Sequence, residues 1–227
     1  MDAMPRPRGG LPLWPLPLLC ALLPLLVSHV ALWLSLRHGL IPACNPYLDG
    51  CVSISRAARH GTGNDLFRMV MLPTASLQAF CWLAAAHWLR RNGGGAARTL
   101  PWLGLLAAMF LALYATFLGS EGAVYQVMRR YGITVYFAST LLAWLTLLRG
   151  LSQQSPRPPA YLPSLVVALG YLLLGLSHLA VRFATTDPAL RYRWENVFEW
   201  QLGLWLTAMF SLLAWTWWRE GMRVWLR

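Results

Sequence analysis

Two carboxylates four residues apart are the groups in this sequence whose spacing best suits chemistry. Glu195 and Glu199 share one face of a helix if that helix begins near Trp194. Glu199 also borders an uncharged, apolar stretch, where a carboxylate is costly unless it has a partner. We expect that partner to be one of three side chains, namely Arg182, Arg68 or His178. In such surroundings Glu199 could act as a general acid or base, and the alternative is a structural ion pair between helix ends.

His178, one turn before Arg182, and Glu121 complete the set of candidate catalytic residues. Loop arginines can hold a lipid phosphate through two hydrogen bonds. We therefore assign head-group binding to four side chains, namely Arg56, Arg68, Arg182 and Glu195. The alternative for any single arginine is an anchor at the membrane interface. His29 is more typical of a packed, hydrogen-bonded histidine than of a ligand.

No known catalytic motif accompanies these residues. The sequence contains no nucleophile elbow, no zinc-protease signature and no phosphate-binding loop. Two histidines and two glutamates at one depth could bind a metal ion, but their spacing does not bring them together. We therefore predict neither a metal site nor a cofactor.

Cys44 and Cys51 stand in the first long loop with six residues between them, whereas Cys20 and Cys81 fall inside apolar stretches. If the loop faces an oxidising compartment, Cys44 and Cys51 could form a disulfide. Two free thiols are the equally open alternative, because the spacing alone does not give the geometry. The pair lacks the spacing of a zinc site.

Composition determines which elements position these residues. Of the 227 residues, 57% are hydrophobic and 12% are charged, whereas soluble domains carry about a quarter charged residues. This balance excludes a soluble enzyme and a disordered tail. The net charge of +11 comes from arginines that interrupt apolar stretches and do not gather on one soluble face, so we expect no nucleic-acid partner.

Six stretches free of Asp, Glu, Lys and Arg are each long enough to cross a membrane as a helix, which takes about 20 apolar residues. A chain without a closed barrel crosses hydrocarbon only as helices. We therefore predict an all-α, polytopic membrane protein in which residues 1–227 form a single domain of six transmembrane helices. The predicted helices are about 11–36, 68–89, 99–119, 131–149, 160–181 and 196–218.

We predict that both termini are cytoplasmic. In this orientation the nineteen arginines divide ten to nine between the inner and outer sides, so the positive-inside rule favours it only slightly. Six of the eight acidic residues then lie on the outer side. The three outer loops emerge on one face, and we expect any site to lie there.

Five segments of the predicted outer face resemble a known family, namely Val52–Ser55, Phe67–Arg68, Phe117–Glu121, Ala180–Phe183 and Trp194–Trp200. At these places the family has a Pro-x-Ile/Val-Ser motif, an aromatic-Arg pair, a Glu-containing turn, an Arg-His loop and a Glu-Tyr pair. The chain is similar over nearly its whole length to the six-helix superfamily of the GPI-anchor lipid-remodelling factor (post-GPI-attachment factor two). That superfamily includes the part of a yeast cell-wall protein that remodels GPI lipids to ceramide, and the damage-regulated autophagy modulators. The chain lacks the proline of the first motif and the histidine after Arg182.

The resemblance implies a protein that handles or remodels a lipid, or a lipid-anchored substrate, at the non-cytoplasmic leaflet. Its partners would be a membrane lipid and either a lipid-anchored protein or a membrane protein, in a bacterial inner membrane or a eukaryotic endomembrane. We expect arginines to hold the head group and Glu199 to position or deprotonate a hydroxyl or water. The alternative is a non-enzymatic membrane modulator or complex subunit that binds lipid or a partner protein. A small transporter is disfavoured, because no inverted repeat is evident.

Overall fold

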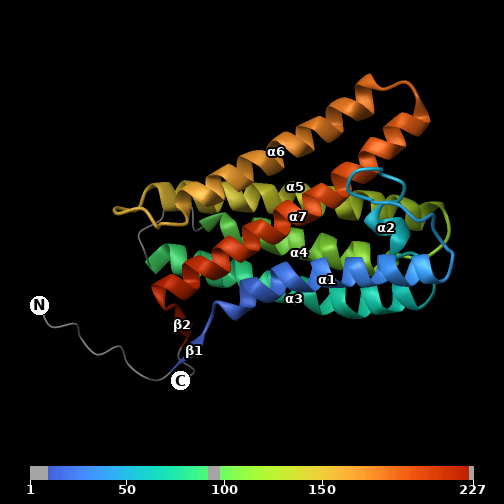
Figure 1. Ribbon diagram of the computed structural model, residues 1–227. Helices are drawn as coiled ribbons and strands as arrows, with labels where there is room; N and C mark the ends of the chain where they lie inside the picture. The colour runs from blue at the N-terminus through green and yellow to red at the C-terminus, as the bar shows by residue number, and fades with distance from the viewer. Residues whose placement is uncertain (1–9, 92–97, 225–227) are drawn as a thin grey trace, which may run out of the picture.

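Six long helices make up most of the computed structural model, which describes residues 10–91 and 98–224 (Figure 1). In chain order the elements are β1 (Leu11–Pro12), α1 (Pro15–Arg37), α2 (Ile54–Ala57), α3 (Gly61–Arg91), α4 (Leu100–Phe117), α5 (Ala123–Ser152), α6 (Tyr161–Ala184), α7 (Pro188–Glu220) and β2 (Arg223–Val224).

The six long helices have the length and composition of membrane spans. They contain 18 to 33 residues, and each includes an apolar window with at most two charged residues. About 20 residues at 1.5 Å per residue cross the hydrocarbon core of a bilayer. The all-α prediction with six candidate spans is therefore confirmed, and the chain is a multi-pass membrane protein.

Three of these helices begin seven or eight residues before the predicted starts: α3 at Gly61, α5 at Ala123 and α7 at Pro188. Their first turns carry charged and polar residues, which we expected in loops. Pro188 suits the first position of a helix, and the Asp187 side chain accepts the Ala189 amide at 2.9 Å, so α7 has an ordinary helix start. The helices thus extend past their apolar windows.

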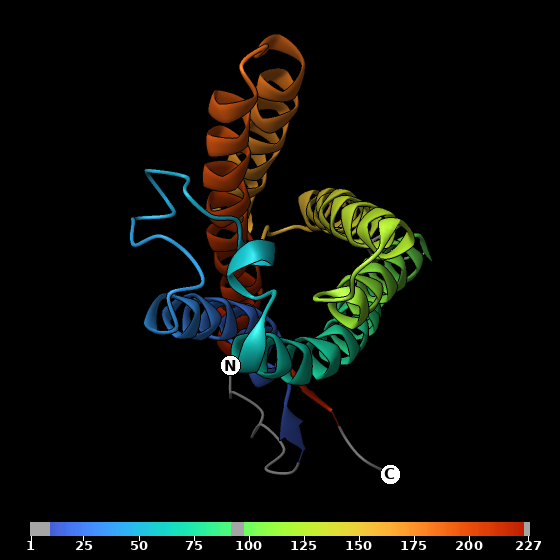
Figure 2. The ribbon, with the colours of Figure 1, turned by 90° about the vertical axis from the view of Figure 1, so that its right-hand side faces the viewer.

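The helices are arranged along an arc and do not form a flat layer. The end-on view in Figure 2 shows α1, α3, α4 and α5 as an arc, with α7 packed beside α1 and α6 packed on α7. Small residues let neighbouring helices approach closely. A side chain at Gly104 of α4 would overlap Trp82 of α3, for example. Trp82 in turn packs edge to face against Trp144 and Phe210, with ring centroids 5.5 and 5.7 Å away.

Helix α6 covers the space between α5 and α7 only over its first half. Its residue Tyr171 is buried, and the Tyr171 hydroxyl donates to the carbonyl of Phe137 on α5 at 3.5 Å. No residue from 172 to 184 is buried. Figures 1 and 2 show this half of α6 leaning away from α5 together with the start of α7.

Both ends of the described chain lie at one end of the bundle. Strands β1 and β2 pair antiparallel, with Leu11 opposite Val224. Six spans also return the chain to the side from which it starts, as predicted. The opposite end carries α2 and the long loop between α1 and α3 (Figure 1).

Candidate ligand cavity

A row of side chains on α7 holds the loop between α1 and α3. Four of them donate to loop carbonyls: Arg193 to Asp49 (2.9 Å), Asn196 to Gly50 (2.8 Å), Trp200 to Val52 (2.9 Å) and Gln201 to Tyr47 (3.3 Å). Peptide groups of an irregular loop have no regular backbone partners, so side chains must supply them. The spacing of the donors along α7 places them on one face of the helix.

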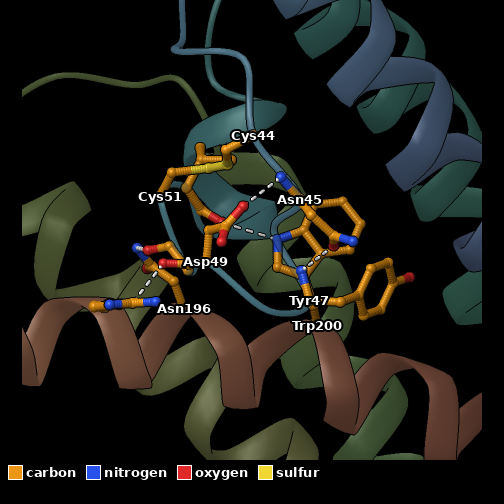
Figure 3. The surroundings of a disulfide bond; sticks show 10 residues. Cys44, Asn45, Tyr47, Asp49, Cys51, Asn196 and Trp200 are labelled. Carbon is orange, nitrogen blue, oxygen red and sulfur yellow. Dashed lines mark hydrogen bonds between the residues drawn. A yellow bond between two sulfur atoms is a disulfide. The ribbon is translucent and has the colours of Figure 1, made fainter.

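Figure 3 shows Cys44 and Cys51 joined by a disulfide beside Asn196 and Trp200 of α7. Of the two interpretations open from the sequence, the structure has the disulfide. The loop turns at Gly50, where φ is +61° and an added Cβ would overlap the backbone carbonyl of Arg193. Glycine is therefore required where the loop meets α7.

Glu199 accepts hydrogen bonds from the first amides of α2. Its Oε1 lies 3.1 Å from the Ser55 nitrogen, and the Ile54 amide also donates to the carboxylate. Arg59 is the cation that acts on it electrostatically. The partners of Glu199 are thus two backbone amides and Arg59, and not the three side chains expected from the sequence, namely Arg182, Arg68 and His178.

Glu199 also faces a cavity inside the bundle. The cavity comprises about 670 Å³ of empty space including its opening, and residues of α1, α3, α4, α5 and α7 line it together with Tyr47 and Ile54. Most of the lining is apolar, and its polar side chains are Ser28, His29, Tyr47, Gln78, Tyr114, Tyr136, Glu199 and Thr207. Among the described residues no arginine lines the cavity.

The cavity is elongated along the helices. Its lining runs from Glu199 to Phe210 on α7 and from Phe67 to Gln78 on α3, which is roughly 16 Å in each case at 1.5 Å per residue. The ring of Phe67 lies 6.3 Å from that of Tyr114, which is within electrostatic reach of Glu199. These three residues therefore mark one end, and Gln78 marks the other.

An aromatic cluster forms part of the wall near Glu199. His29 lies with Nδ1 2.7 Å from the carbonyl of Leu25 and with Nε2 3.0 Å from the Tyr47 hydroxyl. Because a carbonyl only accepts, Nδ1 carries the proton and Tyr47 donates to Nε2. Both rings pack edge to face on Trp200 at 5.3–5.4 Å. Burial raises the pKa of the Tyr47 hydroxyl, which keeps this donor protonated.

Two arginines stand behind the same end of the cavity. Arg59 and Arg129 act electrostatically on each other and on the buried Tyr114. Arg129 donates to the carbonyls of Phe117 and Ser120 at the end of α4. The Nε of Arg59 is buried and has no hydrogen-bond partner in the described part of the chain. Of this pair, Arg59 therefore has a buried donor without a hydrogen-bond partner among the described residues.

The far end of the cavity carries a second polar pair. Gln78 of α3 is fully buried, and its Nε2 donates to the hydroxyl of Tyr136 on α5 at 3.1 Å. The Gln78 Oε1 is buried without a hydrogen-bond partner in residues 10–91 and 98–224. Between this pair and Glu199 the walls are mainly aliphatic and aromatic.

Glu199 is the one predicted site residue that lines the cavity. His178, Glu195 and Arg182 lie together on α6 and α7, where the two charged groups act on the histidine and its ring faces Phe198 at 6.2 Å. Glu195 is linked to Glu199 only through the electrostatic effect of one carboxylate on the other.

The remaining three predicted residues are spread around the same end of the bundle. Arg56 is exposed and donates to the hydroxyl of Tyr192 at 3.0 Å, so it ties α2 to α7. Arg68 is partly buried on α3, and Glu121 is exposed in the link between α4 and α5. The structure therefore does not gather the predicted residues into one pocket. In the described residues no group of three or more His, Cys, Asp or Glu side chains could hold a metal ion.

We did not anticipate the site roles of Arg59, Tyr47 or Gln78 from the sequence. Gln78 gives a usable signal, because it is an amide inside an uncharged stretch where a polar group needs a partner. Arg59 gives none, because Arg56 in the same loop is of the same type. Tyr47 gives none, because a single tyrosine in a loop does not indicate its partner. No protein-family model, curated protein or solved structure matches the chain significantly.

Proposed function

We propose that the protein binds an amphiphilic lipid, or the lipid part of a lipid-anchored molecule, in this cavity. The observation that carries the proposal is an elongated, mainly apolar cavity in a membrane bundle with the carboxylate of Glu199 at one end. Apolar walls suit an acyl chain, and the few convergent polar groups would fix the position of a head group.

The polar end indicates what the head group would meet. Glu199 can accept a hydrogen bond from a hydroxyl or amine, and the positive charge of Arg59 behind this end of the cavity would attract an anionic head group. In this proposal Arg59 takes the role that we first gave to Arg56, Arg68 and Arg182. Glu199 positions or deprotonates a hydroxyl or a water at the head group, so the protein remodels the lipid as well as binding it.

The disulfide supports a non-cytoplasmic location for this end of the bundle. Disulfides such as Cys44–Cys51 persist in oxidising compartments and are rare in the cytosol. With six spans, both termini are then cytoplasmic. This orientation and the six-helix architecture are consistent with the resemblance to the GPI-lipid-remodelling superfamily. We propose a bacterial inner membrane or a eukaryotic endomembrane as the location.

Filling the cavity tests the proposal. Gly203 of α7 lines the cavity, and an added Cβ there would meet only Ile54 at ordinary contact distance, so Gly203→Leu places a side chain in the space. Gly175 of α6 has nothing within 4 Å of an added Cβ, so Gly175→Leu is the matched control. Native mass spectrometry with lipidomics is done on the detergent-purified wild type and both variants.

We expect one lipid class to co-purify with the wild type and with Gly175→Leu, and to be lost from Gly203→Leu. The same bulk-membrane lipids in all three samples would contradict the proposal. Glu199→Gln then separates remodelling from binding. A remodelling role predicts that this variant accumulates the bound lipid or carries it in an altered chemical form, whereas an unchanged lipid would favour the non-enzymatic modulator.

A further inference from the structure

At the cavity end farthest from Glu199, one buried amide has hydrogen-bonding capacity to spare. Gln78 is fully buried and lines the cavity, and its Nε2 donates to the Tyr136 hydroxyl at 3.1 Å. Its Oε1 has no partner in the described part of the chain. Buried side-chain polar atoms nearly always have a partner, most of all where hydrocarbon surrounds them.

Exchanging the oxygen and nitrogen of the Gln78 amide still leaves one of its polar groups without a hydrogen-bond partner. With the amide turned over, the Gln78 oxygen accepts from Tyr136 and the NH₂ group is left without a protein partner. In one orientation the cavity offers an acceptor, and in the other it offers donors. A ligand group that both donates and accepts satisfies Gln78 in either case.

We propose that Gln78 and Tyr136 recognise a hydroxyl group in the apolar chain of the bound lipid, so that the occupant is a lipid with a hydroxylated chain. A hydroxyl can donate and accept at once, which a carbonyl oxygen cannot. The inference rests on the proposed function, because it requires a lipid chain to lie along the cavity. It adds the chemical class of that chain.

The length of the cavity gives the position of the hydroxyl. Gln78 lies roughly 16 Å from the level of Glu199, measured as eleven residues of helix rise. An extended chain whose head group is at Glu199 reaches Gln78 only well beyond its first few carbons. The walls between them include the apolar residues Met71, Leu111 and Leu206. The hydroxyl of Thr207 also lines this stretch, but it already donates to the carbonyls of Ala21 and Gly203.

Three fatty acids of equal length test this placement: octadecanoic acid, the same acid with a hydroxyl on its second carbon, and the same acid with a hydroxyl on its twelfth carbon. Their dissociation constants are measured by displacement of a fluorescent fatty acid from the purified full-length protein in detergent. We expect the acid hydroxylated on its twelfth carbon to bind roughly tenfold tighter than octadecanoic acid, the value of one hydrogen bond to a buried group. The acid hydroxylated on its second carbon should show no gain at Gln78.

Gln78→Leu removes the amide and keeps a side chain of similar size. We expect this variant to bind octadecanoic acid at least as well as the wild type and to lose the preference for the hydroxyl on the twelfth carbon. Tyr136→Phe should reduce the same preference. Met71→Leu changes an apolar wall residue on the same helix, and this matched control should keep the preference.

The outcomes separate the two proposals. If all three acids bind equally to the wild type and Gly203→Leu blocks them, the chain lies in the cavity but water alone satisfies Gln78, and the inference is overturned. If the preference survives in Gln78→Leu, the recognition lies elsewhere and the inference is again wrong. If no acid binds and lipidomics finds only bulk lipid, the proposed function fails as well.

Discussion

Side chains of α7 hold the loop between α1 and α3, which we call the docked loop. Replacing Glu199 by Ala should loosen this loop, whereas replacing Glu199 by Gln should not. The alanine variant leaves the amides of Ile54 and Ser55 without their acceptor. A buried amide left without a partner costs about 1–3 kcal/mol. Both residues are only partly buried, so water can replace some of the loss, and we take the lower half of the range. The two amides together then give about 2–4 kcal/mol of destabilisation.

That destabilisation is large enough to measure. For chains of this length about 1 kcal/mol shifts the melting temperature by about 2–4 °C, so Glu199→Ala should lower it by roughly 4–16 °C. The oxygen of Gln can still accept from the Ser55 amide, so Glu199→Gln should stay within about 1 kcal/mol of the wild type. Unfolding in detergent can be followed with a thiol-reactive dye, because Cys20 and Cys81 are free and buried.

Glu195→Ala is the control for this comparison. It removes a carboxylate from the same helix one turn earlier, where Glu195 makes no hydrogen bond to the loop among those of the described residues, so we expect a change within about 0.5 kcal/mol. Equal destabilisation by Glu199→Gln and Glu199→Ala would show that the charge holds the loop, and would refute the reasoning from backbone acceptors. Wild-type stability of Glu199→Ala would show that the docking of α2 does not depend on this side chain.

Two further predictions concern the docked loop. Gly50→Ala should undock it, because the new Cβ would overlap the Arg193 carbonyl and because alanine at a positive φ is strained. A mild thiol should then reduce the Cys44–Cys51 disulfide faster than in the wild type, and an unchanged rate would contradict the docking geometry. The raised pKa of Tyr47 means that the docked loop is favoured by the neutral hydroxyl, so its stability should be complete below the ordinary pKa of 10.0 and fall as pH rises above it. Tyr47→Phe should remove this alkaline loss in pH-dependent melting curves, and a loss of equal size in the variant would assign it to another group.

The spans could be predicted from the sequence because hydrocarbon imposes one simple rule on every residue that crosses it. Uncharged stretches of the right length became helices in all six cases. The starts of α3, α5 and α7 could not be predicted in this way, since polar residues past the bilayer obey different constraints. Asn64, for instance, is a polar residue in the first turns of α3, and it is buried because its amide donates to the carbonyls of Ala58 and Leu118. Those two partners come from different parts of the chain.

The part of the site that could be predicted is the residue whose own neighbours in the sequence mark it, namely Glu199. Glu199 stands out as a carboxylate beside an apolar stretch, and the structure places it in the cavity. Its partners were not predictable, because a backbone amide such as that of Ser55, 144 positions away, leaves no trace in residue types. The sequence indicated a packed, hydrogen-bonded His29 but did not indicate its partner. Its hydrogen bond to Tyr47 depends on how the loop folds back over α1.

The docked loop also bears on how a ligand reaches the cavity. Access through the loop would break seven hydrogen bonds between it and α7: four to loop carbonyls, two from the Ile54 and Ser55 amides to Glu199, and one from Arg56 to Tyr192. At about 1 kcal/mol each they oppose that route by about 7 kcal/mol, which makes it rarer by a factor on the order of 10⁵. Access from the bilayer between α5 and α7 breaks none of them. Residues 172–184 of α6 leave this side uncovered, because they lean away from α5 and none of them is buried (Figure 2). A lateral route admits molecules already dissolved in the membrane, which is a reason to expect a lipid in the cavity and not a water-soluble substrate.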